Sequence, residues 1–256
     1  MTDGGSETEE REHFLEGAIS IAAAFAAGSR PIRTLYLRDD RPTPELADLE
    51  RLASAQGVPV QRISLEQIGE LANGRSHGGA LALAGERRFT DIEGLVPAGG
   101  EGVVVMVDGV EDPFNFGSAV RSLYAAGVSG LVLRPRNWSS AAGIVARSSA
   151  GASERMPTAI VESPREAADR LRVAGFRVVA AARDRRSISL WEADLSGRVF
   201  LLLGGEKRGI TRSFRDRADL LIHIPYGRPE AEALGTAAAA AIVGFELLRR
   251  RLAGGG

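Results

Sequence analysis

Cysteine is absent from the 256-residue sequence, and histidine occurs only three times. Without cysteine the chain can form neither a disulfide bond nor a thiolate metal site. The three histidines are scattered and do not have the HExxH spacing of a catalytic zinc site. We therefore expect no metal ion and no metal-dependent catalysis.

Long hydrophobic runs are also missing. No segment reaches the roughly 18 uninterrupted apolar residues that indicate a membrane-spanning helix. The first residues, MTDGGSETEEREHF, are acidic and polar, whereas a secretory signal peptide has a basic and then an apolar run. These absences predict a cytoplasmic protein with no membrane partner.

Lysine is nearly missing, since Lys207 is the single lysine among 32 lysine and arginine residues. Arginine suits bidentate phosphate contacts and base stacking, although a GC-rich genome produces the same bias. The formal net charge of −1 does not decide whether a partner is acidic, because nucleic-acid binding depends on where the charges lie. Two arginine clusters, at 134–138 and 183–186, follow predicted strands and are candidates for such contacts.

Two common nucleotide-binding motifs are not found. The dinucleotide pattern GxGxxG is missing after the apolar run at 103–107, where the sequence continues DGVED. The Walker pattern GxxxxGK[ST] is absent because no hydroxyl residue follows Lys207. The sequence therefore argues against a Rossmann dehydrogenase and against a nucleoside triphosphatase.

The chain divides into four segments by composition and periodicity. We expect a disordered acidic tail at 1–11, a small α/β domain at 12–85, a linker at 86–101 and a larger domain at 102–256. In the small domain, Thr43 before Pro44 is a helix start, and Ser64 with Gln67 forms a capping box. Its predicted helices are 14–28, 43–57 and 64–71, and its predicted strands are 32–37, 58–63 and 80–84.

In the larger domain, apolar runs alternate strictly with helical patterns. Buried apolar strands separated by helices predict an α/β fold with a mostly parallel sheet and helices on both faces. The predicted strands are 103–107, 130–133, 158–161, 177–182, 199–203 and 220–224. The predicted helices are near 117–126, 140–147, 164–174, 211–217 and 234–252.

Three loops of the larger domain follow the carboxyl ends of strands, where open α/β sheets bind their ligands. The first brings Asn115 to the start of a helix that carries Arg121, so the two side chains are expected about one helical turn apart. The second is LGGEKRGI at 203–210, and the third runs from 224 to 236. Each alone has a structural explanation, namely a helix cap, a turn or a strand end.

Taken in order, these loops resemble the three motifs of the SpoU/TrmH family of RNA ribose 2′-O-methyltransferases, which belongs to the SPOUT superfamily. The first loop carries the family's Asp-Pro-x-Asn-x-Gly-x-x-x-Arg core at Asp112, Pro113, Asn115, Gly117 and Arg121. The second loop is also similar, with matching residues at Gly204, Glu206, Gly209 and Ile210.

Two further segments are similar to the family, and one departs from it. ARSSAGASERMP at 146–157 resembles a Ser-Ala-Gly-Ala stretch, and His77 with Gly79 resembles an element of the substrate-binding domain. In the third loop, Ala-Leu-Gly at 233–235 stands where the family usually has Ser-Leu-Asn. The resemblance covers nearly the whole chain after residue 12.

The resemblance implies a deep C-terminal trefoil knot, which would be an exception to the rule against threaded loops. It also implies a homodimer that transfers a methyl group from S-adenosylmethionine to a ribose 2′-hydroxyl of ribosomal or transfer RNA. The implied cofactor-binding residues are Leu203, Gly204, Gly205, Gly209, Ile210, Ile224, Pro225, Leu234, Gly235 and Thr236.

Three residues are the implied catalytic group. Arg121 would hold a substrate phosphate and stabilise charge, or would act as the base; its fixed positive charge favours the first role. Asn115 would orient Arg121 or the ribose. Glu206 would position the second loop or an arginine, or would form only a structural ion pair. The implied RNA-binding residues are Arg134, Arg136 and Arg147.

Two other functions stay open. The altered third motif, with Ala233 and Gly235, is compatible with an inert RNA-binding homologue that has lost its cofactor. A knotted methyltransferase that modifies a base in place of a ribose would share the same motifs. Neither the RNA nor the nucleotide is identified, and a housekeeping role and an antibiotic-resistance role are both open.

Overall fold

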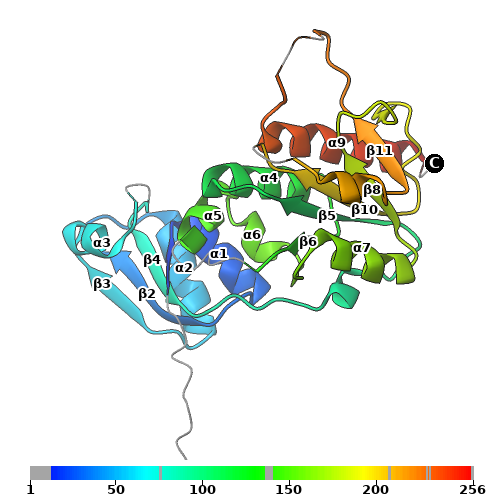
Figure 1. Ribbon diagram of the computed structural model, residues 1–256. Helices are drawn as coiled ribbons and strands as arrows, with labels where there is room; N and C mark the ends of the chain where they lie inside the picture. The colour runs from blue at the N-terminus through cyan, green and yellow to red at the C-terminus, as the bar shows by residue number, and fades with distance from the viewer. Residues whose placement is uncertain are drawn as a thin grey trace, which may run out of the picture. The chain divides into compact units, whose positions relative to one another are not determined.

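The computed structural model describes residues 13–74, 77–135, 141–206, 209–228, 230 and 232–254. The expected tail at 1–11 lies outside them. The described residues form two compact units (Figure 1). The first contains 13–88 and 141–143, and the second contains 89–135 and the described residues from 144 onward.

The first unit has a four-stranded sheet in the order β1-β4-β2-β3. β2 and β3 are parallel, whereas β4 is antiparallel to both β1 and β2. The strands are β1 (His13–Glu16), β2 (Ile32–Arg38), β3 (Val60–Ile63) and β4 (Ala80–Ala84). The helices are α1 (Ala18–Ala27), α2 (Pro44–Ala55) and α3 (Leu65–Leu71).

Two predicted helix starts in this unit are confirmed. The Thr43 hydroxyl accepts a hydrogen bond from the Leu46 amide, and Pro44 is the first residue of α2. Ser64 and Gln67 form the capping box at the start of α3. These short-range signals predict helix ends well because both partners lie within one turn of the chain.

The helix predicted to begin at Phe14 begins later. Phe14 and Leu15 belong to β1, where they pair with Leu83 and Ala82 of β4. Gly17 then has a φ of 85°, a left-handed value that interrupts any helix started before it. The regularly spaced apolar residues of 14–25 therefore belong to two elements, first β1 and then α1.

The second unit has a seven-stranded sheet in the order β7-β6-β5-β10-β8-β11-β9, and every described strand pair in it is parallel. The strands are β5 (Gly102–Asp108), β6 (Gly130–Leu133), β7 (Thr158–Ile160), β8 (Arg177–Ala181), β9 (Ile188–Ser189), β10 (Arg198–Gly204) and β11 (Leu220–His223). The helices are η1 (Ile92–Leu95), α4 (Pro113–Ala125), α5 (Ala142–Ser148), α6 (Ala152–Arg155), α7 (Pro164–Val173), α8 (Arg212–Arg215) and α9 (Thr236–Gly254). The parallel α/β prediction is thus confirmed.

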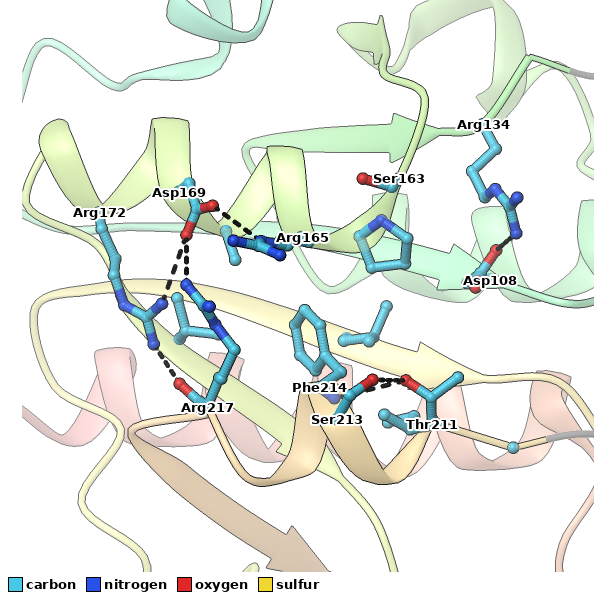
Figure 2. Close-up of a pocket in the computed structure, with 16 residues that line it drawn as sticks. Asp108, Arg134, Ser163, Arg165, Asp169, Arg172, Thr211, Ser213, Phe214 and Arg217 are labelled. Carbon is cyan, nitrogen blue, oxygen red and sulfur yellow. Dashed lines mark hydrogen bonds and ion pairs between the residues drawn. The ribbon is translucent and has the colours of Figure 1, made fainter.

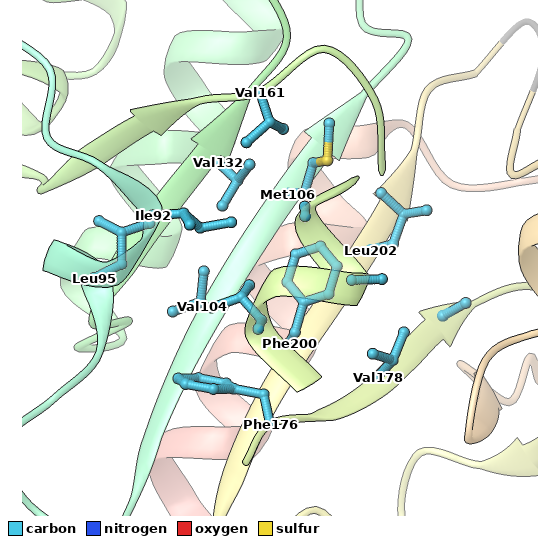
Figure 3. Close-up of a cluster of buried hydrophobic side chains, with 14 of the residues drawn as sticks. Ile92, Leu95, Val104, Met106, Val132, Val161, Phe176, Val178, Phe200 and Leu202 are labelled. Carbon is cyan, nitrogen blue, oxygen red and sulfur yellow. The ribbon is translucent and has the colours of Figure 1, made fainter. Parts of the chain in front are cut away.

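This sheet is buried on both faces. Val104, Met106, Phe200 and Leu202 point to one face, where they pack with Leu171 of α7 (Figure 3). The alternating residues at 103, 105, 201 and 203 are at most 3% exposed. Figure 1 shows α7 on one side of the sheet and α4 with α9 on the other. Because both faces of the sheet are covered, side chains on either face of β5 and β10 are buried, and the two strands are apolar along almost their whole length.

The segment 86–101 is more than the linker that was expected. Ile92 and Leu95 of η1 are each 2% exposed and lie in the same apolar cluster. Thr90 forms a parallel bridge with Ala159 of β7. The glycines and the proline of this segment are typical of a linker, but its two apolar residues are enough to anchor it to the second unit.

Helix α4 begins four residues before the predicted start. The Asp112 carboxylate accepts hydrogen bonds from the Phe114 and Asn115 amides at 3.2 and 3.1 Å, and Pro113 is the first helical residue. The pair Asp112-Pro113 is therefore an N-cap followed by a proline at the first position. Asn115 consequently lies in the first helical turn.

No described helix, the 19-residue α9 included, has the length and apolar character needed to cross a membrane.

Candidate active site

The first two loops leave the sheet side by side. β5 and β10 pair in parallel with Asp108 opposite Gly204. The Gly205 amide donates a hydrogen bond of 2.6 Å to the Asp108 carbonyl. A Cβ atom on Gly205 would lie 2.1 Å from the Gly109 carbonyl oxygen, so the two loops touch backbone to backbone. Only glycine permits this approach.

The second loop also folds back on itself. The Gly209 amide donates to the Gly205 carbonyl at 3.0 Å. A Cβ on Gly204 would lie 2.8 Å from the Gly209 carbonyl carbon, and Gly209 itself has a φ of 57°. The side chain of Leu203 is 2% exposed. The Leu203 side chain, predicted to contact the cofactor, is therefore closed to a ligand in this structure.

Glu206 joins the second loop to the third. Its carboxylate accepts a hydrogen bond of 3.2 Å from the Thr236 amide, the first amide of α9. A negative charge at a helix N-terminus satisfies a free amide and interacts well with the helix dipole. A Cβ on Gly235 would lie 3.1 Å from the carboxylate, so glycine leaves room for Glu206.

Glu206 thus contacts the third loop, and no described arginine pairs with it. Gly235, which stands where the family usually has asparagine, therefore lies beside the Glu206 carboxylate.

The third loop carries a buried hydroxyl that lacks a partner. Thr236 is 2% exposed, and its Oγ1 makes no hydrogen bond within the described residues. An unsatisfied buried hydroxyl costs roughly 1–3 kcal/mol, which a bound ligand could recover. Nearby in sequence, Leu234 is 38% exposed and its amide donates to the Tyr226 hydroxyl at 2.9 Å. Ile224 is half-buried and Pro225 is exposed.

The two candidate residues of the first motif lie on one helix but do not face the same way. Asn115 and Arg121 are six residues apart in α4, which places them about 9 Å apart along the axis and about 120° apart around it. The expected separation of one turn is wrong because Asn115 is already helical. Arg121 is exposed, and Asn115 is half-buried.

Gly117, a further residue of the first motif, has a packing role. A Cβ there would lie 1.8 Å from Ser148 Oγ and 3.0 Å from the Val145 carbonyl oxygen. Ser148 Oγ also donates to carbonyls of α5 and, at 3.3 Å, to that of Pro113. Gly117 thus lets α4 pack closely against the end of α5.

The predicted RNA-binding arginines have different surroundings. Arg134 follows β6, is about half exposed and lies 3.5 Å from the Asp108 carboxylate. Arg147 lies on α5 and is half-buried. Arg136 lies outside the described residues, together with most of the 134–138 cluster. The structure therefore brings Arg134 to the Asp108 end of β5.

A pocket of about 290 Å³ opens beside the second loop, between α7 and α8 (Figure 2). Gly209 and Ile210 line it, with Asp108 and Arg134 at one end. At the other end, Asp169 forms ion pairs with three arginines: Arg165, Arg172 and Arg217. Most of the other lining residues lie on or beside α7 and α8, which carry no recognised motif, so this part of the pocket was not predicted from the sequence.

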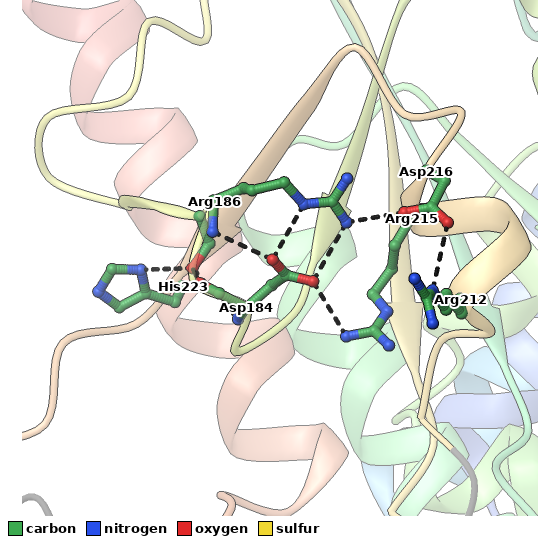
Figure 4. Close-up of polar contacts among 7 residues, drawn as sticks. Asp184, Arg186, Arg212, Arg215, Asp216 and His223 are labelled. Carbon is green, nitrogen blue, oxygen red and sulfur yellow. Dashed lines mark hydrogen bonds and ion pairs between the residues drawn. The ribbon is translucent and has the colours of Figure 1, made fainter.

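The loop after β8 is held by a second ion-pair network (Figure 4). Asp184 pairs with Arg186 and Arg215, and Arg186 also reaches Asp216. The hydrogen bonds from Arg186 and the charge of Arg215 lower the pKa of Asp184 to about 2. Arg186, which belongs to the cluster predicted as a candidate for nucleic-acid contacts, forms ion pairs within the protein.

Comparison with known families matches two regions of the chain. Residues 102–245 match the SpoU rRNA Methylase family, and residues 14–90 match the family described as RNA 2′-O ribose methyltransferase substrate binding.

Similar proteins extend along nearly the whole chain. The 23S rRNA (guanosine-2′-O-)-methyltransferase RlmB of Xanthomonas axonopodis pv. citri is 30% identical over 247 residues, which are 95% of this chain and 98% of that protein. The SpoU methyltransferase AviRb of Streptomyces viridochromogenes has a similar structure, with a TM-score of 0.79, 25% identity and coverage of 95% of this chain and 91% of that one. AviRb has also been crystallised in complex with the cofactor AdoMet.

An AdoMet-bound rRNA methyltransferase from Sinorhizobium meliloti gives a TM-score of 0.77 at 26% identity, covering 94% of this chain and 88% of that one. Because the methylase match alone spans more than half of the sequence, the chain belongs to the SpoU rRNA methylase family.

Proposed function

We propose that the protein transfers a methyl group from S-adenosylmethionine to a ribose 2′-hydroxyl of ribosomal or transfer RNA. The observation that carries this function is the junction of the three motif loops at the carboxyl edge of the parallel sheet. The first loop touches the second through Gly109 and Gly205, and the second touches the third through Glu206 and Thr236. In support, the RlmB relative is named as a 23S rRNA (guanosine-2′-O-)-methyltransferase, and the Sinorhizobium meliloti relative as an AdoMet-bound rRNA methyltransferase.

The second and third loops fit the cofactor. The backbone at Gly204, Gly205 and Gly209 leaves main-chain groups free of side chains, and Thr236 offers a buried hydroxyl that is unpaired within the described residues. Ile210 and Leu234 supply partly exposed apolar surface of the kind that lines adenine sites. When bound, S-adenosylmethionine supplies an electrophilic methyl group on a sulfonium centre.

Arg121 is the residue that we propose for the substrate side. It is exposed on α4 and carries a fixed charge, so it can hold an RNA phosphate and stabilise the negative charge that develops on the 2′-oxygen. Asn115, on another face of α4, is better placed to bind the ribose than to orient Arg121. Glu206 would act by holding the second and third loops in register for in-line transfer.

RNA contacts are proposed for both units. Residues 12–85 would form the substrate-binding domain, which agrees with the family match at 14–90. Arg134 and Arg147, together with Arg136, would bind phosphates. The larger domain, 102–256, would form a trefoil knot as in the family, and the protein would work in the cytoplasm.

We also propose a homodimer. Phe245 and Leu252 on α9 are 49% and 74% exposed, and exposed apolar side chains on one helix are typical of an interface. A homodimer is expected for the family.

Incubation with labelled S-adenosylmethionine and ribosomal or transfer RNA tests this function. We expect one ribose to be labelled and the adjacent phosphodiester to resist alkaline hydrolysis; a labelled but alkali-sensitive site would indicate base methylation. Arg121→Ala is expected to lower kcat/KM at least 100-fold, the usual scale for loss of an electrostatic contact in the transition state.

Arg212→Ala is the matched control, since that arginine is 88% exposed on α8 and, among the described residues, pairs only with Asp216. RNA binding with no cofactor affinity in calorimetry would contradict the proposed function and favour the inert homologue.

A further inference from the structure

We propose that Tyr226 is a positioning residue that holds the third loop in the form that receives the cofactor. The inference rests on the proposed function. Ala233 and Gly235 have no polar side chain with which to fix the loop, so another group must do so. The Tyr226 hydroxyl accepts a hydrogen bond of 2.9 Å from the Leu234 amide, eight residues further along the chain. This bond links Tyr226, near the start of the third loop, to Leu234, near its end.

The ring of Tyr226 is held from the neighbouring strand. β11 and β8 are parallel, with Ile222 opposite Ala181, so the residues after both strands emerge at the same edge of the sheet. The Arg183 guanidinium lies over the Tyr226 ring, 4.9 Å from its centroid. A cation at this distance over an aromatic face is attracted to it and limits rotation of the ring.

The support continues behind Arg183. The next residue, Asp184, is bound by Arg186 and by Arg215 of α8 (Figure 4). Ser187 closes the same turn, since its hydroxyl donates to the Asp184 carbonyl at 2.7 Å. Tyr226 therefore contacts, through Arg183, a loop that is itself held in place by several hydrogen bonds and ion pairs.

The far end of the third loop is fixed independently by Glu206, which accepts from the Thr236 amide. The segment Leu234 to Thr236 is thus bound on both sides by side chains from other parts of the sheet. Fixing these two amides also sets the direction of the Leu234 side chain and of the unpaired Thr236 hydroxyl. Both groups belong to the proposed cofactor site.

Tyr226→Phe removes only the acceptor and keeps the ring, and Tyr124→Phe is the matched control. Tyr124 lies on α4, and no described hydrogen bond uses its hydroxyl. We expect Tyr226→Phe to weaken S-adenosylmethionine binding about 3- to 10-fold, the range for loss of one hydrogen bond. KM for the cofactor should rise by the same factor while kcat changes less than about 2-fold.

A second measurement does not depend on activity. Exchange of the Leu234 amide, followed by NMR, should be faster in Tyr226→Phe than in the wild type, with amides of β10 unchanged. Arg183→Met, which removes the cation over the ring, should produce a smaller effect in the same direction.

Unchanged exchange of the Leu234 amide in Tyr226→Phe would overturn the inference, and so would faster exchange with unchanged cofactor affinity. If the wild-type protein binds no S-adenosylmethionine, the proposed function fails. The proposal that Tyr226 holds the third loop for this cofactor then fails with it. The exchange result then still shows whether Tyr226 orders the loop.

Discussion

Gly205 shows how little space separates the loops of the proposed site. The methyl group of an alanine would lie 2.1 Å from the carbonyl oxygen and 2.4 Å from the carbonyl carbon of Gly109. Both are backbone atoms, so a rotamer change cannot relieve the clash. One loop would have to move away from the other.

Gly205→Ala is therefore expected to lower the free energy of unfolding by about 1–3 kcal/mol, as overpacking usually does. It should also weaken S-adenosylmethionine binding, because the Gly205 amide would separate from the Asp108 carbonyl. Urea denaturation and calorimetry measure the two effects.

Gly100→Ala is the control for this substitution, since a Cβ at Gly100 meets no atom within 4 Å. Equal stability and equal affinity of the two variants would mean that the first and second loops do not need their backbone contact.

Helix α9 is tied to the loop at 190–193 by charged side chains near its C-terminal end. Glu246 is 7% exposed and accepts hydrogen bonds from Arg249 and Arg250. Arg250 in turn donates to the carbonyls of Leu190 and Trp191 at 2.7 and 2.9 Å. The Glu246 carboxylate thus holds the Arg250 guanidinium in place, and this guanidinium donates hydrogen bonds to the carbonyl groups of the loop.

These bonds, the one from Arg249 first, lower the pKa of Glu246 from 4.5 to about 2. Because the folded state holds the proton less tightly than the unfolded state, the stabilisation is complete above about pH 4.5 and is lost as the pH falls toward 2. Glu246→Gln should lower the free energy of unfolding by about 1–3 kcal/mol at pH 7. The difference from the wild type should shrink at acidic pH.

Denaturation curves between pH 7 and pH 3 would show this convergence. Glu192→Gln, at an exposed position before β10, is the control. A difference between Glu246→Gln and the wild type that stays constant over this range would exclude the ionised carboxylate as its source.

Elements with local signals could be predicted from the sequence. The apolar runs of β5 and β10 and the caps at Thr43 and Ser64 depend on neighbours within one turn or one strand. Elements that depend on distant partners could not be predicted. Phe14 becomes part of a strand only because β4 lies beside it.

The candidate site divides in the same way. The motifs identified the loops that contain Arg121 and Glu206, but the partner of Glu206 is 30 residues away and was not predicted. Tyr226 was missed because its partner, Leu234, has no polar side chain and bonds through its amide. The orientation of Asn115 was wrong because the start of α4 was placed too late.

At the scale of the whole molecule, the parallel sheet explains why the site forms at one edge. β10 lies between β5 and β8, so the loops that follow them are neighbours although they are distant in sequence. Helix α9 begins at this edge with Thr236 and leaves Phe245 and Leu252 exposed further along. The proposed dimer would cover this apolar surface.

Replacing Phe245 by Asp should shift the protein from dimer to monomer in sedimentation at micromolar concentration, because a buried unpaired carboxylate is costly. Ile19→Asp, at a position that is 68% exposed on α1 of the other unit, is the control. A dimer that persists in Phe245→Asp would exclude this part of α9 from the interface.

The Glu206 to Thr236 contact has a consequence for the time course of folding. It joins residues 30 positions apart, and α8 and β11 lie between them in the chain. Contacts between distant residues form late because the entropy of closing the intervening chain must be overcome first. We expect the ability to bind cofactor to return after the bulk of the sheet during refolding. A newly made chain would pass through a stage in which it is folded but not yet competent.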